Sequence, residues 1–135
     1  MQEEELVQQA IEAREKSYSP YSGFAVGAAL LTKNGKIYQG CNIENAAYTP
    51  TNCAERTAFF KAVSEGERDF VAIAIVGGKA GEPATDSCPP CGVCRQVMQE
   101  FCGPEFEIIL GNNEGVLMKK RLEELLPYGF GPQNL

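Results

Sequence analysis

Two short cysteine motifs constrain this chain more strongly than any other feature of its sequence. Cys53-Ala54-Glu55-Arg56 is followed downstream by Pro90-Cys91-Gly92-Val93-Cys94, in a chain that contains no histidine. Three cysteines in this pattern are typical of a zinc site with three protein ligands and one open position, where a water molecule becomes a nucleophile. The lack of histidine excludes a Ser-His-Asp triad, a His-Glu-x-x-His metalloprotease and a histidine general base.

Composition and charge limit the class of protein and the kind of substrate. The 135 residues are 44% apolar and 22% charged, so we expect one globular domain spanning residues 1–135. The net charge is -6, and the densest basic cluster is only Lys119-Lys120-Arg121. Because phosphate neutralisation supplies most of the affinity for long nucleic acids, we expect no nucleic acid polymer as a partner and a small, neutral or weakly charged substrate instead.

The N-terminal segment, the apolar runs and the cysteine usage indicate a cytoplasmic location. Residues 1–5 are acidic and lack the pattern of a signal peptide, and the longest apolar runs, 24–31 and 71–76, are too short to cross a bilayer. We therefore expect no membrane association. Six cysteines in such a chain favour metal binding or redox chemistry over a disulfide framework.

The periodicity of apolar residues predicts an α/β fold. It indicates helices over residues 3–17, 53–64, 91–102 and 121–126, and strands over residues 24–32, 37–41, 70–76, 106–110 and 116–118. Asn34-Gly35 predicts a hairpin between the first two strands. The small residues of the first strand indicate that another element packs closely on it. The order of elements predicts a mixed five-stranded sheet with helices on both faces, a three-layer α/β/α sandwich.

The two motifs fall where helices are predicted to begin. Free backbone amides and the helix dipole favour the thiolate at Cys53 and Cys91, and Cys94 lies one turn after Cys91. Two helices that meet end-on would therefore gather three thiolates around one Zn²⁺ ion per chain. We expect Arg56 to offset the resulting negative charge by donating to a ligand sulfur. Glu55 would reach the open position without being a ligand, and there it would move protons between water and substrate.

Cys-Ala-Glu followed by Pro-Cys-x-x-Cys resembles the signature of the zinc-dependent nucleoside deaminases. Four segments are similar to the small, homotetrameric cytidine deaminases: FAVGAAL (24–30), GCNIENA (40–46), CAERTA (53–58) and CGVCRQV (91–97). The similarity runs from the first helix to Leu126-Pro127 and Phe130, nearly the whole chain. It implies a cytidine deaminase-like fold and a hydrolase that acts on the amidine C–N bond of cytosine nucleosides.

The resemblance also implies a reaction and a set of roles. Cytidine and 2'-deoxycytidine would become uridine and 2'-deoxyuridine with release of ammonia, a step of pyrimidine salvage. An activated water would attack C4 of the pyrimidine, while Glu55 protonates N3 and then helps the amino group to leave. Zinc would be held by Cys53, Cys91 and Cys94, with Arg56 beside them.

The substrate contacts implied by the resemblance come from several segments. Asn42 and Glu44 would bind the ribose 3'-hydroxyl, Phe24 would stack near the base, and Ala54 would be a further contact. Ala46, Tyr48 and Phe130 match positions that reach a neighbouring subunit, so the resemblance implies a homotetramer with shared sites.

Other readings of the same residues remain open at this stage. Zinc would be purely structural if Cys41, Cys88 or Cys102 supplied a fourth ligand, and the chain would then be a non-enzymatic zinc-binding module. The segment 88–91 is itself a Cys-x-x-Cys pair, which is found in redox proteins. Within the deaminases, a blasticidin-type enzyme is the alternative, although Asn42-Ile43-Glu44-Asn45 favours an ordinary ribonucleoside.

Overall fold

A five-stranded mixed sheet forms the middle layer of the molecule. We describe residues 3–135 from a computed structural model. The strands are β1 (Phe24–Thr32), β2 (Ile37–Cys41), β3 (Phe70–Lys79), β4 (Glu107–Asn112) and β5 (Gly115–Arg121), in the order β2-β1-β3-β4-β5. β3 and β4 run parallel, and the other neighbouring pairs are antiparallel. The predicted hairpin and the predicted mixed sheet are confirmed.

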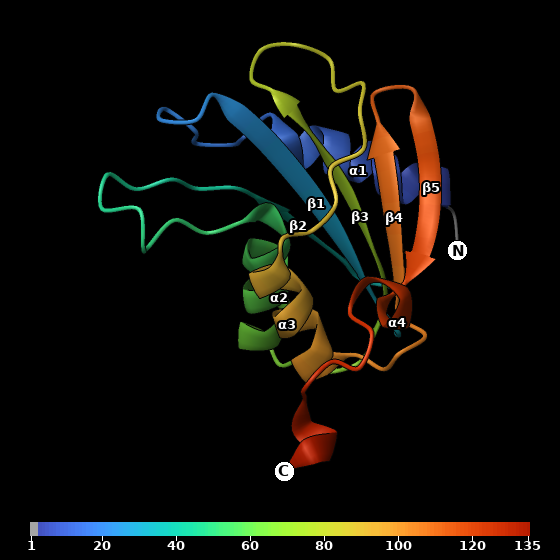
Figure 1. Cartoon of the computed structure of the whole chain (residues 1–135). Coiled ribbons are helices and arrows are strands. Elements are labelled where there is room, and N and C mark those ends of the chain that lie inside the picture. The colour runs from blue at the N-terminus through green and yellow to red at the C-terminus, as the bar shows by residue number, and fades with distance from the viewer. Residues whose placement is uncertain (1–2) are drawn as a thin grey trace.

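Helices cover both faces of this sheet (Figure 1). α1 (Glu3–Arg14) lies on one face, where Leu6, Val7 and Ala10 are buried against the strands. α2 (Ala54–Ser64) and α3 (Gly92–Phe101) lie side by side on the other face, and their cores centre on Phe59 and Met98. Two hydrophobic cores, one on each face, therefore hold the three-layer α/β/α sandwich together.

Two glycines allow the helices to approach the sheet closely. A Cβ added to Gly27 of β1 would lie 2.8 Å from the Cα of Arg14 in α1. A Cβ added to Gly40 of β2 would lie 2.6 Å from the backbone nitrogen of Ala58 in α2. The prediction that another element packs closely on the first strand is confirmed. In the same way, Gly40 allows a close approach of α2 to the sheet, and α2 follows directly after Cys53.

Several elements end at different residues from those predicted. α1 stops at Arg14 rather than at residue 17, because the amides of residues 15–17 bond to carbonyls three residues back, at 3.1–3.2 Å, instead of four. Arg14 itself is buried, and its guanidinium donates to the carbonyls of Ala25, Lys79 and Glu82 at 2.8, 2.7 and 2.8 Å. β3 continues three residues beyond the predicted end and pairs with β1 as far as Phe24.

The chain ends in two short helices, α4 (Leu122–Leu125) and the 3-10 helix η1 (Pro132–Asn134). No helix within residues 3–135 has the length and apolar character needed to cross a membrane.

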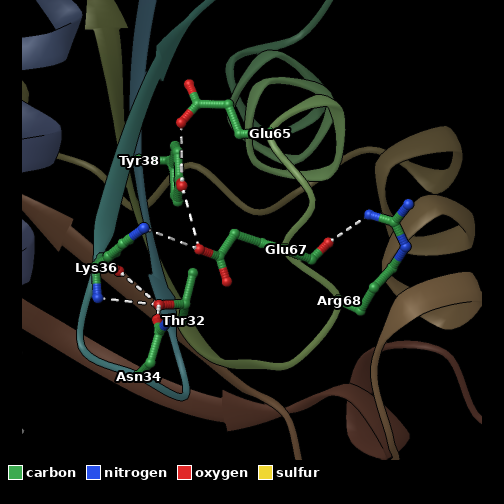
Figure 2. A network of polar contacts seen from close by, with 7 residues as sticks. All are labelled: Thr32, Asn34, Lys36, Tyr38, Glu65, Glu67 and Arg68. Atoms are coloured by element: carbon green, nitrogen blue, oxygen red, sulfur yellow. Dashed lines mark hydrogen bonds and ion pairs between the residues drawn. The ribbon is translucent and has the colours of Figure 1, made fainter.

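A polar network fixes the C-terminal end of α2 against β2 (Figure 2). The buried hydroxyl of Tyr38 lies 3.3 Å from a carboxylate oxygen of Glu65 and 3.3 Å from one of Glu67. Lys36 Nζ lies 3.6 Å from the same oxygen of Glu67. This end of the helix is opposite to the end at which Cys53 lies, so the network and Gly40 together set the orientation of α2.

Candidate metal centre and adjoining substrate site

Three thiols meet where two helices begin. Cys53 is the N-cap of α2 and Cys91 is the N-cap of α3, while Cys94 lies in the first turn of α3. The three Sγ atoms lie within 4.8 Å of one another, and Cys53 Sγ and Cys91 Sγ are 3.8 Å apart. Tetrahedral zinc with Zn–S bonds of about 2.3 Å separates its sulfur ligands by about 3.8 Å. The donor set and its spacing therefore fit one zinc ion.

The remaining cysteines do not complete a four-thiolate site. Within residues 3–135, the cluster that could hold a metal ion consists of Cys53, Cys91 and Cys94. Cys41, Cys88 and Cys102 are free thiols outside it. A three-thiol cluster leaves a fourth position open, as in catalytic rather than structural zinc sites. Burial raises the pKa of Cys88 to about 11, which is opposite to the lowered pKa of a redox-active Cys-x-x-Cys thiol.

Arg56 is placed to neutralise the thiol cluster. Its Nη2 lies 3.2 Å from Cys53 Sγ. Its Nε is buried and has no hydrogen-bond partner among the described residues. The pKa of Cys53 is lowered, first by a hydrogen bond from Cys94 and then by Arg56, while the same hydrogen bond raises the pKa of Cys94. Cys53 is therefore the thiol of this pair that ionises first.

Glu55 lies beside the cluster but outside it. It is the second residue of α2, and only 4% of its surface is exposed. Burial raises the pKa of its carboxyl to about 7, and the neighbouring Cys53 adds to that rise, while its own backbone amide opposes it. A carboxyl group that is buried next to an open metal position can carry a proton without binding the metal.

Asn42 and Glu44 belong to the loop that connects β2 to Cys53 and α2. Ile43, which stands between them, pairs with Asn52 through two backbone hydrogen bonds of 2.9 Å. Asn52 immediately precedes Cys53, so this pairing brings the backbone around residues 42–44 to the root of the loop that leads into α2. Figure 1 shows this loop between β2 and α2.

The side chain of Asn42 is held by three hydrogen bonds. Its Oδ1 accepts from the Val26 amide at 2.9 Å and from the Ser17 hydroxyl at 2.5 Å. Its Nδ2 donates to the Phe24 carbonyl at 2.8 Å. Since an amide nitrogen carries two hydrogens, one N–H of Asn42 remains for a ligand.

Glu44 is held by the turn that precedes β1. Its Oε1 accepts from the backbone amides of Tyr21 and Ser22 at 2.9 and 3.1 Å, and its Oε2 accepts from the Ser22 hydroxyl. These hydrogen bonds, that from the Ser22 hydroxyl first, hold the pKa of Glu44 below its usual range. The sequence showed residues 19–23 only as a turn, and nothing in its pattern pointed to these contacts with residue 44.

The other predicted substrate residues are mostly on the surface. Phe24, Tyr48 and Phe130 have 43%, 73% and 59% of their surface exposed, and Ala46 is also exposed, whereas Ala54 is fully buried. The rings of Tyr48 and Tyr21 meet edge to face with centroids 6.3 Å apart.

A surface cavity of about 350 Å³ lies beside the Tyr21–Tyr48 pair, and its lining includes Tyr21, Ser22, Glu44 and Tyr48. Phe130 lies in the C-terminal segment, which is attached to α3 because Gln96 Nε2 donates to the Phe130 carbonyl at 2.7 Å. The structure of one chain therefore joins Glu44 and Tyr48 in one cavity but records no contact of Phe130 with that cavity.

Comparisons with known proteins agree with this arrangement. The family described as "Cytidine and deoxycytidylate deaminase zinc-binding region" matches residues 1–109. The cytidine deaminase of Sporosarcina psychrophila is 50% identical over 135 residues, which are 100% of this chain and 96% of that protein. The crystal structure of cytidine deaminase from Burkholderia pseudomallei has a TM-score of 0.87 at 48% identity, covering 96% of this chain and 100% of that one.

A more distant relative is the Blasticidin-S deaminase of Bacillus cereus, 36% identical over 108 residues, which are 78% of this chain and 76% of that protein. The family match covers well over half of the chain, and the α/β fold agrees with that of the solved cytidine deaminase. The chain belongs to the cytidine and deoxycytidylate deaminase family.

Proposed function

We propose that this chain hydrolyses cytidine and 2'-deoxycytidine to uridine and 2'-deoxyuridine and releases ammonia, with one zinc ion per chain. The observation that carries the proposal is the trio Cys53, Cys91 and Cys94 at two helix N-termini, with the buried Glu55 beside it. The family match and the two cytidine deaminases described above support the choice of substrate.

In this reaction the C4–N bond of the pyrimidine breaks and a C4–O bond forms from water. Zinc, when bound, would lower the pKa of a coordinated water and so supply the nucleophile at neutral pH. Glu55 would take a proton from the attacking water and deliver it to N3 of the base. It then carries the second proton of the water to the 4-amino group, which leaves as ammonia. Arg56 keeps the electron-rich thiolates from opposing the ionisation of the water.

The family resemblance gives Asn42 and Glu44 the sugar-binding role, and their remaining hydrogen-bond capacity supports it. A carboxylate offers about four lone-pair sites, of which three are used in Glu44. One acceptor site on Glu44 and one N–H on Asn42 remain. A hydroxyl group, which both donates and accepts, satisfies both at once. A nucleoside that lacks the matching hydroxyl would leave this acceptor site of Glu44 and this N–H of Asn42 without a partner in the complex, which favours the nucleoside that carries the hydroxyl.

The base would lie between the sugar-binding pair and the metal centre. Phe24 stacks near the base in this proposal, and Ala54, buried at the start of α2, forms part of the wall beside Glu55. Uncharged nucleosides bind in sites that combine apolar or aromatic walls with a few placed polar groups.

We further propose that the chain is one domain, acts in the cytoplasm and assembles as a homotetramer with sites shared between subunits. Ala46, Tyr48 and Phe130 would complete a neighbouring subunit's site. The exposure of the two aromatic side chains supports this, since large exposed aromatic groups are common at interfaces.

Six free thiols fit the reducing cytoplasm. Light scattering coupled to size-exclusion chromatography tests the assembly, and cell fractionation tests the location.

The deciding experiment is the release of ammonia from cytidine, measured before and after removal of zinc by a chelator and again after zinc is restored. We expect activity that disappears with the metal and returns with it. Blasticidin S serves as the comparison substrate, and turnover of blasticidin S without turnover of cytidine would replace the proposed substrate. Bound zinc with no ammonia from any nucleoside would support a non-enzymatic zinc module instead.

A further inference from the structure

Ser22 lies between two residues to which the proposed function gives substrate contacts. Its hydroxyl donates to Glu44 Oε2, and its backbone amide donates to Glu44 Oε1 at 3.1 Å. The same hydroxyl oxygen accepts a hydrogen bond from the backbone amide of Phe24 at 3.0 Å. One side chain therefore touches both the carboxylate proposed to bind the sugar and the main chain of the aromatic residue proposed to contact the base.

The direction of these hydrogen bonds leaves Glu44 with one free acceptor position. A serine hydroxyl has one hydrogen and two lone pairs. Because the Phe24 amide supplies a hydrogen to the oxygen, the hydroxyl hydrogen is the donor to Glu44. Oε1 is already filled by two backbone amides. The remaining lone pair thus lies on Oε2, next to the hydrogen bond from Ser22, and the position of that lone pair depends on the serine.

The turn that carries Ser22 is itself anchored to the sheet. Gly23, at a φ of 67°, adopts a conformation that other residues rarely take, and its carbonyl accepts from the Ala80 amide at 2.8 Å. The backbone of Tyr18 pairs with that of Asn42 and Glu44 at 3.0 and 2.8 Å. Ser22 is therefore held by rigid neighbours and can fix the carboxylate rather than follow it.

From this geometry we propose that Ser22 is a positioning residue for nucleoside recognition, which sets the remaining acceptor of Glu44 toward a sugar hydroxyl and fixes its distance from Phe24. This inference rests on the proposed function, since it requires that Glu44 binds that hydroxyl. It also predicts a difference between substrates: Ser22 contributes to the binding of nucleosides that carry the hydroxyl and contributes little to the binding of those that lack it.

The test compares cytidine with 3'-deoxycytidine in the wild type and in Ser22→Ala. A lost hydrogen bond to a charged group costs roughly tenfold or more, so we expect KM for cytidine to rise about 10-fold in the variant, while kcat stays within about 3-fold. For 3'-deoxycytidine we expect kcat/KM of the two proteins to agree within about 3-fold. Ser22→Thr retains the hydroxyl and restores KM for cytidine. Ser64→Ala is the matched control, because the Ser64 hydroxyl donates to the Lys61 carbonyl at 2.8 Å within α2 and takes no part in holding Glu44.

The outcomes separate the inference from the function on which it rests. If the wild type uses both nucleosides equally well, Glu44 does not read this hydroxyl, and the sugar-binding role and the inference both fail. If the wild type prefers cytidine but Ser22→Ala keeps the same preference, only the role of Ser22 is overturned. An equal loss on both substrates would mean a merely structural role. Should Ser22→Ala not fold, Ser22→Cys carries the same test, because its S–H is a weaker donor of similar size.

Discussion

Replacing Arg56 by glutamine tests whether the thiol cluster needs a neutralising charge. Arg56 Nη2 lies 3.2 Å from Cys53 Sγ, within the range of a hydrogen bond to sulfur. A hydrogen bond that involves a charged group contributes about 1.5–3 kcal/mol. At about 1.4 kcal/mol for each factor of ten, we expect the zinc dissociation constant of Arg56→Gln to rise about 10- to 150-fold. Glutamine keeps a polar side chain at the position but removes the charge.

Competition with a chromophoric chelator at neutral pH measures this constant directly. Arg56→Lys keeps the charge without the planar fork of the guanidinium, so we expect a smaller loss of affinity. Arg68→Gln is the control, because Arg68 donates to backbone carbonyls at the other end of α2. An unchanged zinc constant in a folded Arg56→Gln protein would refute the proposed charge compensation, and so would an equal loss in Arg68→Gln.

Four further changes test other parts of the molecule. Glu55→Gln should keep its zinc content but lose kcat by about 100- to 10,000-fold, because both proton transfers depend on the carboxyl; near-normal turnover would contradict the mechanism. Gly40→Ala should lower the free energy of unfolding by about 1–3 kcal/mol, measured in urea, because the new Cβ would displace α2. Burial and the two facing glutamates raise the pKa of Tyr38, so the folded state holds that proton more tightly than the unfolded state. The wild type should thus lose stability as the pH rises above about 10, and unfolding measured across this range should show a weaker loss in Tyr38→Phe. Deleting residues 128–135 should raise KM and weaken the proposed tetramer, as measured by kinetics and light scattering; an unchanged oligomeric state with an unchanged KM would show that this segment is dispensable.

The metal centre could be predicted from the sequence because its signals are local. Cys53 and Cys91 are N-caps, and each precedes a helix whose apolar periodicity is visible in one segment. Thiols at helix starts are favoured as thiolates whatever the rest of the fold does. The non-local requirement is that the N-termini of α2 and α3 lie close together. A mixed sheet that carries both helices side by side on one face fulfils this requirement.

The extent of the strands was harder to predict for a physical reason. β3 continues through Gly77 and Gly78, where the apolar run has already ended. Pairing with β1 requires only backbone groups there, and Gly77 lies so close to Cys88 that a Cβ at this glycine would be 2.7 Å from the cysteine sulfur. A residue without a side chain is therefore required at a position where periodicity predicts a loop.

The hydrogen-bond partners of the proposed sugar-binding residues could not be predicted from sequence patterns. Tyr21 and Ser22 contact a residue more than twenty positions away, through backbone amides that every residue type carries. Sequence periodicity reports which side chains are buried, not which amides point at a distant carboxylate. Only the identity of residues 42 and 44 was available from the resemblance, and their remaining hydrogen-bond capacity required the structure.

Cys53 of the metal centre and the proposed sugar-binding pair, Asn42 and Glu44, lie toward the two ends of one loop, so the loop connects the proposed reaction site to the proposed recognition site. Asn42 follows β2 directly, and Cys53 caps α2 at the end of the same loop. The pairing of Ile43 with Asn52 closes the loop at its root, and Glu44 is held by Tyr21 and Ser22, so the segment 45–51 can vary without moving either end. A nucleoside spans a fixed distance between its sugar hydroxyl and its C4 carbon. The pair of backbone hydrogen bonds between Ile43 and Asn52 therefore keeps the separation of the two ends constant, independently of the side chains at the tip of the loop.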